Sequence, residues 1–180
     1  MRLVSNSSWA NGIRYLQLDR RFPWADNKVD VVYASHVLEH LDKRTRNNFL
    51  REAHRILKPT GVMRIVVPDL YYHAKKYVLN FDTSESGAEA FLHTIHLRFP
   101  EQTNLLMGLY NFWMGYPHLH KNMYDKYTLE RLAKDHNFTP LGYFSYGRSP
   151  NIENIKDVEF RDEEDGSIYL EAMKNVAERN

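Results

Sequence analysis

The stretch that decides the fold is VDVVYASHVLEHL, residues 29–41, because a strand pattern gives way there to a turn and then to a helical period. Residues 29–34 are a nearly continuous apolar run of strand length, which is typical of a parallel strand buried on both faces. From Leu41 to Leu57, apolar side chains recur at helical spacing. Proline and glycine in KPTG, residues 58–61, predict the end of this helix.

A second β-branched run, residues 62–67, follows the helix directly. Strand, helix and strand within about forty residues make a βαβ unit, which predicts two parallel strands with a right-handed crossover. Weaker patterns predict strands over 13–18, 138–143 and 167–172 and helices over 71–79 and 127–136. Apolar and aromatic residues between 88 and 115, among them Phe91 and Leu92, are interpreted as core packing, with a substrate-facing lid as the alternative. The chain is therefore predicted to be an α/β protein.

The amino-acid composition limits the classes of protein to which the chain can belong. At 180 residues and 43% hydrophobic, the chain can bury the core of one domain, and we expect residues 1–180 to form a single unit. Its formal charge of +1 gives no overall field that would attract nucleic acid. The absence of cysteine excludes disulfides and thiolate metal sites and fits a reducing cytosol. No run of eighteen apolar residues occurs, so we predict a cytoplasmic protein without a membrane segment.

Five short motifs occur in a fixed order along the chain. They are FPW (22–24), VDVVYASHVLEHL (29–41), RILKPTG (55–61), VVPD (66–69) and HKNMYD (120–125). In this order they resemble the type 11 family of class I S-adenosylmethionine-dependent methyltransferases. The resemblance implies a Rossmann-like methyltransferase sheet, mostly parallel with an antiparallel final strand, in the strand order 3-2-1-4-5-7-6. It also implies S-adenosylmethionine as cofactor and methyl transfer to a small-molecule or saccharide acceptor.

The chain departs from this family at its start. Intact members begin with a strand, a glycine-rich loop, a helix and a second strand that ends in an acidic residue. Here only Met1–Gly12 precedes the predicted strand over 13–18, and that segment has one glycine and no acid. We therefore expect an N-terminally incomplete domain whose first strands are missing or replaced. Binding of S-adenosylmethionine by this chain alone is expected to be weak or absent.

The resemblance places the cofactor across the carboxyl ends of the parallel strands. Its adenine would meet the end of the strand over 13–18, at Gln17 or Asp19, although Asp19 fits a solvated turn aspartate equally well. Its methionine end would pass the turn at Ala34, Ser35 and His36.

Three residues are candidates for catalysis, because the resemblance puts their segment near the substrate. They are His118, His120 and Tyr124. Glu39 and His40, by contrast, are expected to orient the turn between strand and helix. No residue is assigned as a metal ligand.

Two alternatives to an active methyltransferase stay open. One is a non-catalytic methyltransferase-fold scaffold that serves in binding or assembly. The other is a zinc hydrolase, because His36-x-x-Glu39-His40 fits the inverted zinc-protease motif, in which two histidines on one helical face share a zinc ion. Three fixed positions in five make this motif a weak signal, and such proteases need a third ligand from downstream.

A homo-oligomer is also predicted. The apolar strand over 29–34 would become a sheet edge if the first strands were missing, and such an edge is an aggregation template. Either residues 13–18 pair with it or a second copy does. The connecting residues 19–28 are short for a parallel crossover, which favours the second copy.

Overall fold

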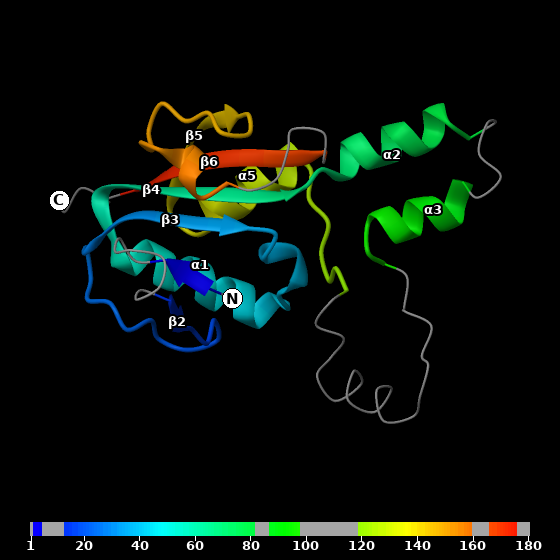
Figure 1. Ribbon diagram of the computed structural model, residues 1–180. Helices are drawn as coiled ribbons and strands as arrows, with labels where there is room; N and C mark the ends of the chain where they lie inside the picture. Colours follow the sequence, from blue (N-terminus) through cyan, green and yellow to red (C-terminus); the bar gives the residue numbers. More distant parts are fainter. Residues whose placement is uncertain (1, 5–12, 82–86, 98–118, 160–165, 176–180) are drawn as a thin grey trace, which may run out of the picture.

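The computed structural model describes residues 2–4, 13–81, 87–97, 119–159 and 166–175 (Figure 1). The strands are β1 (Arg2–Val4), β2 (Ile13–Tyr15), β3 (Val29–Ser35), β4 (Leu57–Pro68), β5 (Phe138–Phe144) and β6 (Ser167–Lys174). The helices are η1 (Leu38–His40), α1 (Lys43–Ile56), α2 (Leu70–Leu79), α3 (Gly87–Thr94), α5 (Lys126–Asp135) and η2 (Ile155–Asp157). None of the described helices has the length and apolar character needed to cross a membrane.

The main sheet has four strands in the order β3-β4-β6-β5 (Figure 1). β3 runs parallel to β4, β6 runs antiparallel to β4, and β5 runs antiparallel to β6. Three strands therefore share one direction, and only β6, the last in the chain, opposes them. This confirms the predicted sheet, mostly parallel with an antiparallel final strand, and its order reproduces the 4-5-7-6 part of the expected arrangement.

The core lies on one face of this sheet. Alternate residues of β4, namely Met63, Ile65 and Val67, are buried there because side chains alternate between the faces of a strand. α1 and α5 cover this face, and their apolar side chains belong to the same buried cluster as those of β4. In α1 these are Phe49, Leu50, Ala53 and Ile56, which follow the helical period that the sequence predicted.

β3 is not buried on both faces, which corrects the sequence prediction. Val32 and Ala34 face the core and are buried, whereas Asp30 is exposed and Val31 is 36% exposed. The opposite face of β3 is covered only in part, by a small cluster in which Tyr33 packs against residues from the loop after β5. The apolar run therefore reflects strand propensity at Val31 rather than burial.

The end of α1 also differs from the prediction. β4 begins at Leu57, directly after the helix, so residues 58–61 are part of the strand rather than a separate turn. The register of the pairing between β3 and β4 shifts between Val29 and Val31, and this shift accommodates the irregular start of β4. Proline at 59 still limits the helix, because it disfavours helical backbone at the residue before it.

Residues 13–18 do not join the main sheet. Only Ile13–Tyr15 forms a strand, and it pairs antiparallel with β1 in a separate two-stranded sheet. Within the described part of the chain, β3 pairs with β4 alone. The short connection over 19–28 is held along α1 instead of crossing the sheet, as the next subsection describes.

α2 and α3 pack on each other beyond the carboxyl end of β4 (Figure 1). Phe91 packs against Tyr77 with ring centroids 5.1 Å apart, and Leu92 is 41% exposed. These two residues are therefore not part of the sheet core, which corrects their interpretation as core packing. The remaining apolar residues of that stretch, from 98 to 115, lie outside the described residues.

A capping box fixes the start of α5 and gives a first prediction. The Asp125 carboxylate accepts from the Thr128 backbone N–H at 2.7 Å, and the Thr128 hydroxyl accepts from the Asp125 N–H at 3.0 Å. Asp125→Ala should lower the free energy of unfolding by about 1 kcal/mol, because the Thr128 N–H loses its side-chain acceptor. Urea denaturation measures this loss. Glu153→Ala, in an exposed loop, is the control and should change stability by less than about 0.5 kcal/mol; equal effects would contradict the capping role.

Candidate functional site

The candidate site lies where the parallel strands β3 and β4 end. Ser35, the last residue of β3, is in register with Val66, and the His36 N–H donates to the Val66 carbonyl at 2.9 Å. His36 then adopts a left-handed backbone conformation with φ 51°, which turns the chain away from the sheet into η1. β4 ends nearby, at Pro68. In open α/β sheets, ligands bind at this carboxyl edge.

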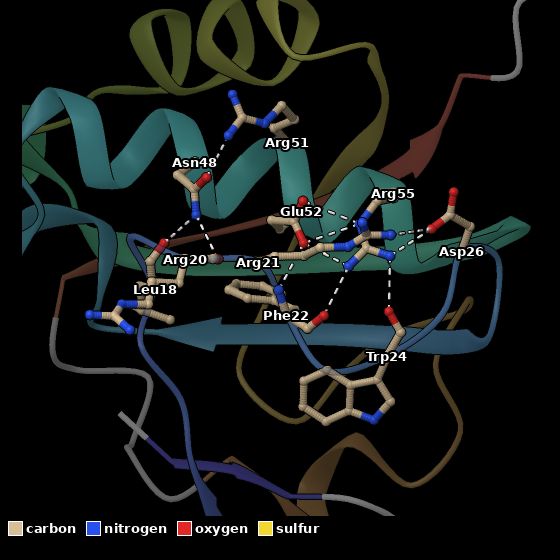
Figure 2. A network of polar contacts seen from close by, with 10 residues as sticks. All are labelled: Leu18, Arg20, Arg21, Phe22, Trp24, Asp26, Asn48, Arg51, Glu52 and Arg55. Carbon is tan, nitrogen blue, oxygen red and sulfur yellow. Dashed lines mark hydrogen bonds and ion pairs between the residues drawn. The ribbon is translucent and has the colours of Figure 1, made fainter.

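Ala34, Ser35 and His36, which were predicted for the methionine end of the cofactor, are consecutive residues at the carboxyl edge of β3. Ala34 is fully buried, while Ser35 and His36 are half-buried at the edge itself. Gln17 and Asp19 lie on a different segment and are exposed. That segment is fixed to α1, because the Asn48 side chain donates to the Leu18 and Arg20 carbonyls at 2.7 and 2.9 Å (Figure 2).

The same segment is fixed to α1 again at Arg55. Its guanidinium donates to the Phe22 and Trp24 carbonyls and to the carboxylates of Glu52 and Asp26 (Figure 2). The Phe22 N–H donates to Glu52 at 2.8 Å. Two motifs that are distant in sequence, FPW (22–24) and RILKPTG (55–61), therefore meet in one polar network.

The segment after residue 118 folds over the site. The Glu39 carbonyl accepts from the Lys121 and Asn122 N–H groups at 2.6 and 3.0 Å. The Asn122 side chain donates to the Leu41 carbonyl at 2.6 Å and accepts from Arg46 at 2.9 Å. Residues 119–124 are thus joined to η1 and to the first turn of α1, about eighty positions earlier in the chain.

The three catalytic candidates have different environments. His118 lies outside the described residues. Tyr124 is 4% exposed; its hydroxyl donates to the Leu38 carbonyl at 3.3 Å and accepts from Arg46 at 3.2 Å. Burial raises the pKa of Tyr124, so its phenol stays neutral at neutral pH and holds the segment to η1.

His120 is the candidate that lies beside two other histidines. It is 6% exposed, and its ring stands 4.8 Å from that of His40 and 4.9 Å from that of His96, measured between centroids. Burial lowers the pKa of His120 to about 4. The ring is therefore neutral at neutral pH, the form that accepts a proton or a metal ion.

Glu39 is the residue that sequence reasoning undervalued. It is fully buried in η1, and within the described residues neither of its carboxylate oxygens accepts a hydrogen bond. His36 Nδ1 lies 3.1 Å from Glu39 Oε1. The sequence signal for Glu39 was its position between Leu38 and Leu41. A carboxylate in an apolar stretch is expected to be buried, and a buried carboxylate needs a partner that compensates its charge.

The helical zinc motif is not formed. His36 lies before η1 in a non-helical conformation, and η1 itself has only three residues, Leu38–His40. His36 and His40 are therefore not placed one helical turn apart on a common face, as the zinc-hydrolase alternative requires. That alternative was wrong in its geometry.

Comparison with known proteins agrees with the motifs. Residues 2–65 match the family described as the methyltransferase domain. The resemblance to the type 11 methyltransferase family is confirmed. The matched part of the chain includes β3, η1 and α1, which build the candidate site.

Two solved methyltransferase structures share the fold. One is from the complex between the Haloferax volcanii Trm112 methyltransferase activator and a methyltransferase, with TM-score 0.50 and 12% identity over 91% of this chain. The other is an S-adenosylmethionine-dependent methyltransferase from Methanosarcina mazei, with TM-score 0.52 and 14% identity over 89% of this chain. The present chain spans 60% and 66% of their lengths. The open four-stranded sheet is thus part of a Rossmann-like methyltransferase fold.

The methyltransferase cofactor fits one side of the described site. The turn in left-handed conformation at His36, next to the half-buried Ser35, lies at the carboxyl edge where the methionine end is expected. The exposed Asp19 can accept hydrogen bonds from hydroxyl or amino groups. Close packing by a glycine-rich loop has no counterpart among the described residues at this edge.

Proposed function

We propose that this chain is part of an S-adenosylmethionine-dependent methyltransferase that acts on a small-molecule or saccharide acceptor. The observation that carries the proposal is the turn at Ser35 and His36, which follows β3 at the carboxyl edge of the sheet and lies within the matched residues 2–65. S-adenosylmethionine supplies an already activated methyl group, so the protein chiefly has to orient the acceptor and exclude water.

The residues of this chain have distinct parts in the proposal. Ser35 and His36 would hold the methionine end, and Asp19 or Gln17 the adenosine end. His120 is neutral at neutral pH, so a ring nitrogen can accept a hydrogen bond from an acceptor hydroxyl or amine. Tyr124 positions the segment that carries His120 through its bond to Leu38.

Cofactor binding tests the proposal. S-adenosylhomocysteine should bind the isolated chain with a dissociation constant of roughly 0.1–1 mM, weak because the glycine-rich wall is lacking. Isothermal titration at high protein concentration measures it. Asp19→Ala should weaken binding about tenfold, by loss of one hydrogen bond to a charged group. The matched control is Asp30→Ala, an exposed aspartate at the other end of β3; no heat of binding by the wild-type chain would refute the proposal.

We also propose that a second copy of the chain covers the free edge of β3. Val31 is 36% exposed on this strand, and in the part of the chain that the structure describes β3 has β4 as its sole strand partner. Sedimentation velocity at tens of micromolar should show a dimer or higher oligomer. Val31→Lys should shift the equilibrium toward monomer, because a charge on an edge strand opposes strand pairing. A stable wild-type monomer would contradict the proposal.

A further inference from the structure

Glu39, His40 and His120 form a compact group of metal-ligating side chains at the carboxyl edge. Their ligand atoms all lie within 4.8 Å of one another, although the residues come from η1 and from the segment that folds over it. We propose that these three residues bind a divalent transition-metal ion of the zinc class. The proposal rests on these contacts and not on methyl transfer, although His120 takes part in both.

The carboxylate of Glu39 gives the first reason. Its side chain is 0% exposed, and among the described residues no group donates a hydrogen bond to Oε1 or Oε2. Burial of a carboxylate without hydrogen bonds is costly, and a bound cation is one of the few ways to compensate it. His36 Nδ1, 3.1 Å from Oε1, supplies a full charge only when it is protonated.

The two histidines give the second reason. His40 Nδ1 lies 3.2 Å from the Leu119 carbonyl oxygen, so this nitrogen carries the proton and Nε2 keeps its lone pair. Metal-bound histidines usually donate their other N–H in this way to a backbone carbonyl. His120 Nδ1 is buried without a hydrogen-bond partner in the described structure. Both rings thus have a nitrogen free to bind a metal.

The ligand types determine the class of ion. Two imidazoles and one carboxylate suit Zn²⁺ and similar transition metals, with a further coordination position left open. Mg²⁺ prefers oxygen ligands and is expected to bind much more weakly. The group differs from the helical motif of the sequence analysis, because His120 takes the place of His36.

Metal titration tests the proposal. After treatment with a chelator and its removal, the 180-residue chain should bind one Zn²⁺ per chain in isothermal titration, and Mg²⁺ at least about 100-fold more weakly. Glu39→Gln and His120→Gln should each weaken Zn²⁺ binding more than about tenfold. His136→Gln is the matched control, because His136 lies at the end of α5 and bonds to Leu132.

Thermal unfolding separates a metal ligand from a structural residue. Without metal, Glu39→Gln should unfold at the same temperature as wild type or higher, because it removes a buried charge without hydrogen bonds. Zn²⁺ should raise the midpoint of wild type and not of Glu39→Gln. Absence of Zn²⁺ binding by wild type, or equal binding by Glu39→Gln, would overturn the proposal. Titration of the same metal-free protein with S-adenosylhomocysteine tests the proposed function separately.

Discussion

Arg64→Met should lower the free energy of unfolding by about 3–5 kcal/mol, the cost of leaving buried carboxylates without their cation. Arg64 lies in the middle of β4 and is 0% exposed. Its Nε donates to Glu159 at 2.6 Å and its Nη1 donates to Glu171 at 2.7 Å, and both acids are buried. One guanidinium therefore compensates two carboxylates on the face of the sheet opposite α1.

The loss of Arg64 also affects the backbone of the loop after β5. Arg64 Nη2 donates to the Ser145 carbonyl at 3.0 Å and Nη1 to the Arg148 carbonyl at 3.3 Å. These bonds hold the loop after β5 against the sheet, beside the small apolar cluster on this face. We expect amide exchange over 145–159 to rise in Arg64→Met more than exchange in α1.

Urea denaturation measures the loss, and a multiple variant is the control. In Arg64→Met/Glu159→Gln/Glu171→Gln the carboxylates are neutralised, so a large part of the lost stability should return. A loss below about 1 kcal/mol in the single variant would show that the ionic group contributes little. No recovery in the triple variant would show that the loss comes from packing instead of charge.

Arg55→Met should produce the second large effect, a loss of about 2–4 kcal/mol together with release of residues 20–28 from α1. Arg55 Nη2 donates to Glu52 at 2.6 Å, and Glu52 is 6% exposed (Figure 2). The variant leaves this carboxylate without a cation and leaves the Phe22 and Trp24 carbonyls without their donor. Residues 20–28 should then exchange amide hydrogens faster than β4 does.

The pH dependence of this effect has a defined sign. The Arg55 guanidinium lowers the pKa of Glu52 below its usual 4.5, through a hydrogen bond. The stabilisation is therefore present above about pH 4.5 and is lost as pH falls through the lowered folded-state pKa. The stability difference between wild type and Arg55→Met should shrink at acidic pH. Arg55→Lys keeps the charge and should lose less than Arg55→Met; equal losses, independent of pH, would contradict the ionic explanation.

The sequence predicted the elements whose local pattern and tertiary environment agree. The helix over Lys43–Ile56 follows from apolar spacing and from the Asp42 cap, which accepts from the Thr45 N–H at 2.9 Å. The parallel pairing of β3 with β4 follows from the βαβ pattern. The strand predicted over 13–18 is limited to Ile13–Tyr15 and pairs with β1, and Val31 is more exposed than predicted. Strand propensity does not state which strand is the partner or which face is covered.

The sequence by itself determined the βαβ unit, the order of the motifs and hence the methyltransferase resemblance, because helical period, strand period and turn residues are local properties of the chain. Only the tertiary structure decided which polar residues meet. Arg64 lies within a β-branched run, yet its partners Glu159 and Glu171 come 95 and 107 positions later. Glu39 and His120 are likewise brought together by the fold. Distances between side chains far apart in sequence depend on how the helices and strands pack, and the local sequence pattern does not specify that packing.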